Sequence, residues 1–188
     1  MNVNRLAGWY AALASLLATA VLIADDGGAA VEAEASDPDA PASARGDLTI
    51  EEARGQARLL HGTYNAALRT IHRRYFDAEE KEAIPAKALE DMFPEIDEGT
   101  GRTTRWISVN TPAMNVDHEP RDGFEKQAAE ALAEGKKEFE SVEGSVYHRA
   151  GEVRLVASCL KCHLSSLTRQ VQKDRVAALV ISIPVRTE

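Results

Sequence analysis

The sequence predicts an α+β fold, in which about four antiparallel strands form a sheet with helices packed to one side of it. Three observations support this fold class. Apolar residues recur at helical spacing from Thr49 to Tyr75, and they alternate with polar residues between positions 145 and 158. A further apolar run, rich in β-branched residues, extends from Val176 to Val185 and predicts a buried strand. A chain of 188 residues is long enough for one such domain and a tail.

The chain begins with an apolar segment, Leu6 to Ala24, that carries no charge. As a helix with a rise of about 1.5 Å per residue, it would just cross a hydrocarbon core of about 30 Å. Arg5 precedes it, and Asp25 and Asp26 follow it, so the positive-inside rule places the rest of the chain outside the cytoplasm. We expect a periplasmic protein in which residues 1–24 are a cleaved signal peptide or a membrane tether.

Residues 25–47 are rich in alanine, proline, glycine and acidic side chains, with almost nothing to bury. This composition predicts a disordered linker, which leaves residues 48–188 for the globular domain. The whole chain has 22 Lys and Arg against 30 Asp and Glu, a formal charge of -8. That balance disfavours nucleic acid or an anionic membrane surface as a partner.

The globular domain is expected to open with a helix of about seven turns. Thr49 and Glu52 have the spacing of a capping box, and the helical pattern continues to Tyr75. His61 and His72 are eleven residues apart, so they share one side of this helix at a separation of roughly 16 Å.

A shorter helix, AKALEDMF, is expected after Pro85 and before the polar turn DEGTG. The β-branched and aromatic residues from Arg105 to Val109 predict the first strand. A loop from Asn110 to Pro120 follows, and it carries Met114 and His118.

The next predicted helix is capped by Asp122 and Glu125 and continues to about Phe139. After it, a hairpin with its turn at Ala150-Gly151 is predicted from the segments SVYHR and EVRLVAS. A short polar helix would then lead from the cysteines to Gln172 and on to the last strand.

The only two cysteines of the chain are Cys159 and Cys162, and His163 follows directly. Cys-x-x-Cys-His is the attachment signature of c-type haem. The spacing lets two thiols add to the two vinyl groups of one porphyrin and presents the neighbouring imidazole to the iron as proximal ligand. We therefore expect one covalent haem c on these three residues.

Other uses of this cluster have less support. A thioredoxin-like dithiol would need a βαβ context, which the sequence lacks, and a structural zinc site would need at least one further ligand. A disulfide across two residues would be strained and would stabilise little. Small cytochromes c have their motif near the start and a later methionine, whereas neither Met nor His follows His163 here. The cytochrome c-prime type has a late motif in a four-helix bundle, which the predicted strands contradict.

The stretch from Arg102 to Val185 resembles the single-haem, PAS-like sensor domains long catalogued as a domain of unknown function. That family occurs as periplasmic proteins or as the input domains of membrane sensor kinases, so the resemblance implies a PAS-like antiparallel sheet. After the motif, this chain lacks the glycines that the family often has, and residues such as Arg175 stand in their place. The shared features, in order, are Arg102-Thr-Thr before a strand, the loop Asn110 to Asn115, Pro120 before Phe124-Glu125, the aromatic hairpin around Tyr147, Cys159 to His163, and Ser182 to Pro184.

A second axial ligand would have to come from upstream of the motif. The resemblance implies a cysteine in some members, but both cysteines of this chain are committed to the haem. We rank His72 first, because it ends the long helix just ahead of Tyr75 and Phe76, where an apolar pocket could form. Met92 is expected to fill core. The full set of candidates is His61, His72, His118, His148, Met92 and Met114, with an empty position as the alternative.

These observations predict an exported mono-haem cytochrome that acts in electron transfer or in haem-based redox or gas sensing, and that is not an enzyme. Its partner would be a redox protein or a signalling protein. No kinase or second membrane span follows within the 188 residues, which favours a carrier. One alternative is a periplasmic haem peroxidase, with His72 or His61 as acid/base residue beside Arg69 or Arg73. The other is a non-haem zinc or dithiol protein.

Overall fold

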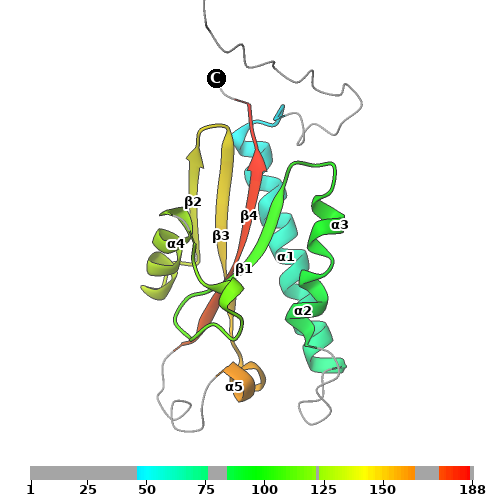
Figure 1. The fold of residues 1–188 in the computed structure, drawn as a ribbon, viewed down its shortest axis with the longest axis vertical. Helices are drawn as coiled ribbons and strands as arrows, with labels where there is room; N and C mark the ends of the chain where they lie inside the picture. The colour runs from blue at the N-terminus through cyan, green and yellow to red at the C-terminus, as the bar shows by residue number, and fades with distance from the viewer. Residues whose placement is uncertain (1–45, 76–83, 122, 164–173, 187–188) are drawn as a thin grey trace, which may run out of the picture. The chain divides into compact units, whose positions relative to one another are not determined.

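The computed structural model describes residues 46–75, 84–121, 123–163 and 174–186, and shows a mixed α and β architecture around a four-stranded antiparallel sheet (Figure 1). The strand order is β1-β4-β3-β2, so the last strand of the chain lies in the interior of the sheet. The elements are α1 (Ile50–Arg74), α2 (Pro85–Glu90), α3 (Phe93–Asp97), β1 (Thr103–Ser108), the 3-10 helix η1 (Val116–His118), α4 (Gly123–Ala133), β2 (Glu138–Glu143), β3 (Val146–Arg154), α5 (Ala157–His163) and β4 (Val176–Pro184).

Several sequence predictions fall outside these residues. They concern the signal or anchor segment 1–24, the linker as far as residue 45, the cap at Asp122 and the polar helix after residue 163. Within the described part of the chain, none of the helices combines the length and the apolar character that crossing a membrane requires.

Helix α1 begins as its capping box predicts. The backbone N–H of Glu52 donates to Thr49 Oγ1 at 3.2 Å, and the Thr49 N–H donates to Glu52 Oε2 at 2.8 Å. Two of the N–H groups that a helix start leaves without partners are thereby satisfied. Ala53, Ala57 and Tyr64 then form the buried stripe that faces the sheet.

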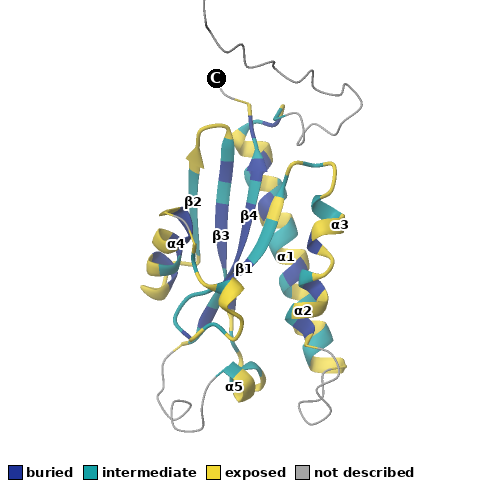
Figure 2. Ribbon diagram, viewed as in Figure 1, coloured by how far each residue is buried: buried dark blue, intermediate teal, exposed yellow. Residues whose placement is uncertain are grey.

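Helices cover both faces of the sheet, so the prediction of helices on one side is wrong. Strand β4 shows why, because successive residues along it are buried (Figure 2). Leu179 and Ile181 belong to the cluster packed with α1, α2 and α3, whereas Ala178 and Val180 belong to the cluster packed with α4. Successive residues of a strand point to opposite faces, so an apolar run of this kind requires cover on both.

The single helix predicted after Pro85 is two short helices, α2 and α3. Pro94 stands in the first turn of α3, and a proline ring there starts a new helix more readily than it continues an old one. Met92 lies between the two helices with 45% of its surface exposed, which contradicts its predicted place in the core. Phe93 takes that place.

The helix predicted to reach Phe139 ends earlier, at Ala133. Gly135 has a φ of 103°, a conformation that suits glycine and stops the helix. Phe139 therefore lies in strand β2, where it packs against Phe124 with 5.6 Å between ring centroids. The prediction extended an α-helical pattern through what is a strand.

The predicted turn at Ala150-Gly151 is also wrong, because both residues lie in the middle of β3. The turn between β2 and β3 is at Gly144, whose φ is 58°. Gly151 is needed for another reason: a Cβ atom at this position would lie 2.5 Å from the ring of His61 on α1. A glycine inside a strand often marks such a close approach.

Candidate functional site

The Cys-x-x-Cys-His cluster lies on the short helix α5. Cys159 and Cys162 are one turn apart, so their side chains share a face of the helix. Both are free thiols, with Cys159 half-buried and Cys162 exposed. His163 follows Cys159 by four residues and thus lies on the same side as that thiol. The local geometry suits two covalent attachments and one ligand to a single flat group.

The chain is held firmly on both sides of the segment that contains α5. Before α5, the N–H of Leu155 donates to the Arg175 carbonyl at 2.9 Å. Where the chain returns to the sheet, Asn110 Nδ2 donates to the Asp174 carbonyl at 3.0 Å, and the Val176 N–H donates to Asn110 Oδ1 at 2.9 Å. These bonds fix the segment to the end of the sheet, below which α5 lies (Figure 1).

His118 and His72, which come from different elements, both lie near His163 at this end of the molecule. Burial lowers the pKa of His163, and the nearby imidazoles of His118 and His72 lower it further. His118 comes from η1, and His72 comes from the last turn of α1. In the described residues no three His, Cys, Asp or Glu side chains are grouped closely enough to hold a metal ion by themselves.

His118 is oriented by a carboxylate. Its Nε2 lies 2.8 Å from Glu90 Oε1 on α2, and the two side chains are exposed to the same small extent. Lys87 pairs with the same carboxylate at 3.3 Å. The pKa of Glu90 is lowered, because burial, which opposes ionisation, is outweighed by the contacts with His118 and Lys87.

The loop that carries His118 is pinned by a buried acid. Glu125, only 4% exposed, pairs with Arg105 and accepts the backbone N–H of Arg121 at 2.7 Å. The Arg105 guanidinium also donates to the Asp117 carbonyl. One ion pair thereby connects strand β1, helix α4 and the 3-10 turn of His118.

The other two histidines are held inside the fold, away from α5. The His61 ring lies against Gly151 on the α1 side of the sheet, and burial together with Arg149 lowers the pKa of His61 to about 4. His148 Nδ1 lies 2.8 Å from Ser182 Oγ, and its ring is 5.1 Å from that of Phe124 on the α4 side. Both histidines are part of the packing around β3.

Exposed apolar side chains border the end of the molecule where α5 lies. They lie just after α1, just before α2, in η1 and the loop before it, and just before α5. The residues and their exposed fractions are Tyr75 78%, Ile84 56%, Met114 58%, Val116 76% and Val156 50%.

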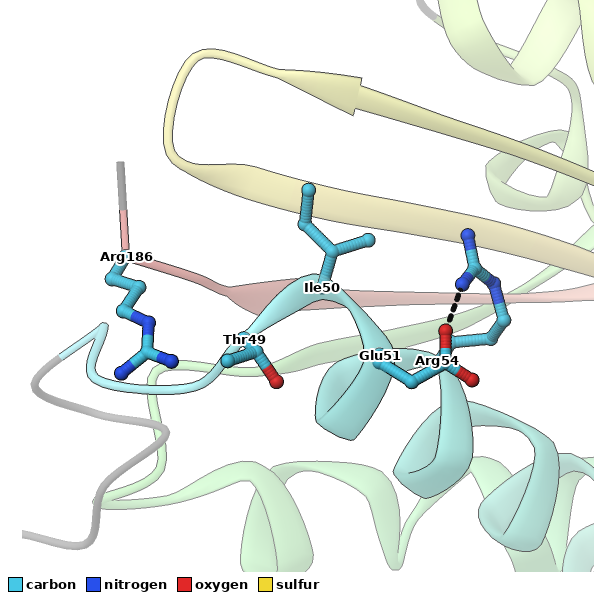
Figure 3. A pocket seen from close by; sticks show the side chains of 5 residues that line it. All are labelled: Thr49, Ile50, Glu51, Arg54 and Arg186. Carbon is cyan, nitrogen blue, oxygen red and sulfur yellow. Dashed lines mark hydrogen bonds and ion pairs between the residues drawn. The ribbon is translucent and has the colours of Figure 1, made fainter. Parts of the chain in front are cut away.

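Two cavities of the fold lie elsewhere. One of about 280 Å³ is lined by Thr49, Ile50 and Arg186 among others, at the start of α1 (Figure 3). Another of about 320 Å³ lies between α3 and β1, with Glu90 and Asp97 in its wall. Neither has a residue of the cysteine cluster in its lining.

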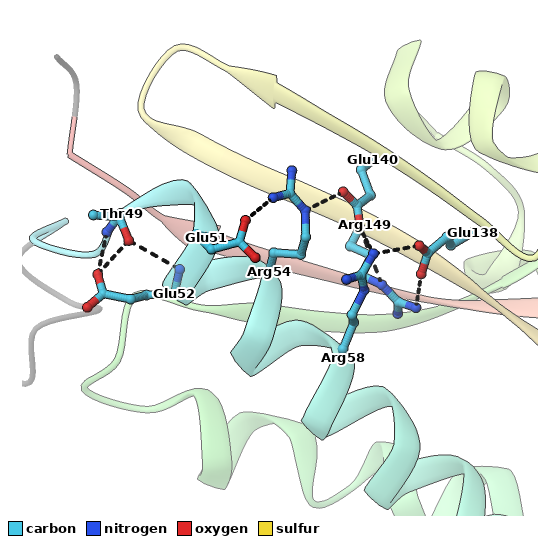
Figure 4. A network of polar contacts seen from close by, with 8 residues as sticks. All are labelled: Thr49, Glu51, Glu52, Arg54, Arg58, Glu138, Glu140 and Arg149. Carbon is cyan, nitrogen blue, oxygen red and sulfur yellow. Dashed lines mark hydrogen bonds and ion pairs between the residues drawn. The ribbon is translucent and has the colours of Figure 1, made fainter.

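A network of arginines and glutamates joins α1 to the β2–β3 edge of the sheet (Figure 4). Arg54 Nε pairs with Glu140 at 2.8 Å, and Arg58 and the buried Arg149 both pair with Glu138, at 2.8 and 2.6 Å. Arg54 also pairs with Glu51, so three arginines and three glutamates neutralise one another within the network. Its role is therefore to fasten the long helix that carries His72.

The sequence pattern predicted the three residues of the motif, but it did not predict the contacts that hold the chain near them. Glu90, Arg105, Asn110 and Glu125 have their partners 20 or more residues away. No local periodicity reveals such pairs. The one available signal was the acidic residue Glu125, which follows Phe124 at the start of a predicted helix. This signal is weak, because a carboxylate in the first turn of a helix is common for other reasons.

Comparison with known proteins gives one sequence family and one solved fold. Residues 45–179 match the sequence profile of the Tll0287-like family. The crystal structure of the cyanobacterial heme-protein Tll0287 superposes with a TM-score of 0.58 at 16% identity, covering 75% of this chain and 99% of that one. No match is found among curated proteins.

Proposed function

The chain belongs to the Tll0287-like family, and from that premise we propose that it is an exported c-type haem protein with one covalently attached haem. The observation that carries the proposal is the arrangement on α5: two free thiols one turn apart, followed at once by a half-buried histidine. Cys159 and Cys162 form the thioether links, and His163 is the proximal ligand. The solved relative is itself a heme-protein, which supports the same cofactor.

We propose His72 as the distal ligand, because the last turn of α1 places it near His163. Of the upstream histidines, His61 and His148 are packed against the sheet, and His118 has its Nε2 engaged with Glu90. Imidazole usually binds haem iron through the unhindered Nε2, so the bond with Glu90 makes His118 the poorer ligand. His118 and His72 both lie near enough to His163 to lower its pKa, and the effect of His118 is the larger.

When bound, a c-type haem supplies a one-electron iron couple, and a pair of histidine ligands gives that couple a lower potential than a His/Met pair. The exposed apolar residues around α5, such as Tyr75 and Val116, would then pack against the porphyrin. The protein uses this couple without transforming a substrate. It passes electrons to a redox partner, or it reports redox state or a diatomic gas to a signalling partner. Residues 6–24 tether it to the membrane or direct its export.

Haem attachment can be tested directly. The protein is produced together with the c-haem maturation machinery, and its mass and its pyridine haemochrome spectrum are measured. We expect a mass increase of one haem and the spectrum of a haem with both vinyl groups saturated. Cys159→Ser with Cys162→Ser should lose covalent haem. If the matured protein keeps the bare polypeptide mass, the proposal fails and a zinc or dithiol function must replace it.

The distal ligand is tested by three matched variants. His72→Ala should convert the ferrous haem from low spin to high spin and open it to carbon monoxide, because the iron loses an axial ligand. His61→Ala and His118→Ala remove the same group from other positions and should leave the low-spin bands in place. A low-spin spectrum in His72→Ala would exclude this residue, and loss of those bands in His118→Ala would assign the ligand to the loop.

A further inference from the structure

Helix α1 has an outer face that turns away from the sheet and is exposed along its whole length. We define it by six residues, Glu51, Gly55, Leu59, Gly62, Ala66 and Arg73. At about 100° per residue they lie opposite the buried stripe of Ala53, Ala57 and Tyr64. The face is thus unpartnered within the described residues.

The middle of this face is unlike an ordinary water-facing helix surface. Leu59 is 71% exposed, the largest fraction of any leucine on the described surface. Gly55 and Gly62 stand beside it, and a Cβ atom at either position would meet nothing within 4 Å. Glycine is a poor helix former, and neither glycine is required by a neighbour in the same chain. Small residues of this kind let a second helix approach closely.

The charges on the same face change sign from one end to the other. Glu51 lies in the first turn of α1, where it also pairs with Arg54, whereas the exposed Arg69 and Arg73 lie toward the other end of the helix. The stretch between Gly55 and Ala66 has no charge on this face. Positions 51 and 73 are symmetric about position 62. An identical helix that runs in the opposite direction across Gly62 would therefore set each acidic end against a basic end.

We propose that the outer face of α1 binds the same face of a second copy of this chain, antiparallel, with the two-fold axis beside Gly62. Leu59 then packs on the partner's Ala66 and Gly62, and Glu51 lies near the partner's Arg73. A two-fold interface uses one patch twice and has to be self-complementary, which this charge order provides. A parallel pair would instead place Glu51 against Glu51 and Arg73 against Arg73.

The size of the face sets the strength of the association. One side of a seven-turn helix offers less area than the roughly 1,200 to 2,000 Å² that stable complexes bury, so the dimer is reversible. It does not depend on haem, because none of these residues belongs to the α5 site.

Sedimentation equilibrium of the purified full chain, in one detergent for all variants, measures the association. Leu59→Glu places two carboxylates, one from each chain, at the centre of the interface. We expect the dissociation constant of the dimer to rise at least tenfold. Val142→Glu is the matched control, an exposed valine on β2 that should leave the dimer unchanged. A wild-type chain that stays monomeric, or equal association in Leu59→Glu and wild type, would overturn the proposal.

The variant Gly62→Leu distinguishes an effect on association from an effect on the stability of the fold. The new side chain has open space in the single chain and replaces a poor helix former, so the melting temperature of the monomer should rise by a few degrees. The same side chain fills the space that the partner helix needs, so association should weaken at least tenfold. Unchanged or tighter association in this variant would contradict a close crossing at Gly62.

A charge exchange tests the direction of the helices. Glu51→Arg and Arg73→Glu should each weaken association severalfold, and the double variant should restore it, because opposite charges again face one another. In a parallel pair the double variant would leave like charges together. Absence of rescue therefore counts against the antiparallel arrangement.

Discussion

The ring of His61 lies directly over Gly151. Helix α1 and strand β3 can approach each other closely there because Gly151 has no side chain. A Cβ atom on Gly151 would lie 2.5 Å from the ring and 2.7 Å from Arg149 Nη1. This contact fixes the height of α1 above the sheet along the turns that lead to His72.

Gly151→Ala should therefore destabilise the fold. The added methyl group has to displace either the imidazole or the buried guanidinium, and overpacking of this kind costs about 2 kcal/mol of unfolding free energy. Urea denaturation measures the loss. Gly55→Ala is the control, since its Cβ enters open space on a helix and should raise stability slightly. Equal stability of Gly151→Ala and wild type would show that α1 can shift at little cost.

His61 should make the stability of the fold depend on pH. Its pKa is about 4 in the folded protein and 6.5 in the unfolded chain. Between pH 6.5 and pH 4, His61 binds a proton in the unfolded chain but not in the folded protein. The contribution of His61 to the unfolding free energy is therefore complete above pH 6.5 and falls as the pH drops toward 4. The loss amounts to at most about 3 kcal/mol for a shift of this size.

Denaturation of the wild type and of His61→Gln across this pH range isolates the effect. The difference between their unfolding free energies should shrink as the pH falls, because the variant has no buried base to protonate. A constant difference from about pH 7 to about pH 4 would mean that His61 titrates normally in the folded protein.

Glu125→Ala should loosen the loop that carries His118, because it also removes the acceptor of the Arg121 N–H. It leaves Arg105 without its buried carboxylate, and breaking a buried ion pair from one side costs about 3 kcal/mol. Thermal unfolding gives the total loss, and hydrogen exchange at the Arg121 amide reports the loop itself. Lys137→Gln, which breaks the exposed pair with Glu152, should change both readings little. Protection of the Arg121 amide as in wild type would refute the pinning role.

Asn110 should anchor the chain after α5 through two separate bonds. Asn110→Ala removes both, whereas Asn110→Asp keeps the acceptor for the Val176 N–H and loses the donor to the Asp174 carbonyl. We expect a graded loss of stability of about 1 kcal/mol for the aspartate and about 2 kcal/mol for the alanine. Hydrogen exchange of the Val176 amide should quicken in the alanine variant and stay slow in the aspartate variant. The opposite order would be inconsistent with this assignment.

Local signals in the sequence were sufficient for part of the fold. The capping box at Thr49 predicted the start of the long helix, and the apolar run from Val176 predicted a buried strand. Both signals lie within the segments that they describe. Strand β2 was missed because its charged residues, Glu138 and Glu140, find their partners on α1, and its pairing with β3 is fixed across the sheet. The Ala150-Gly151 turn was misplaced because the glycine is required by His61, on a helix far earlier in the chain.

The same distinction holds for the candidate site. Cys159, Cys162 and His163 lie close together in the sequence, and their spacing alone predicts the haem attachment that we propose. The support around them joins distant positions, such as Glu90 with His118 and Arg105 with Glu125. These pairs depend on how β1, α2 and α4 meet, which residue spacing does not reveal.

The two ends of the described domain lie side by side. The Arg186 N–H donates to the Leu48 carbonyl at 2.9 Å, and Gly46 lies close to the Val185 carbonyl. A few added residues would thus bridge the two ends, so a circularly permuted chain, opened at the Gly144 turn, should retain the same topology. The domain can equally be inserted as a cassette into a surface loop of another protein, whose loop ends need stand only a few ångströms apart.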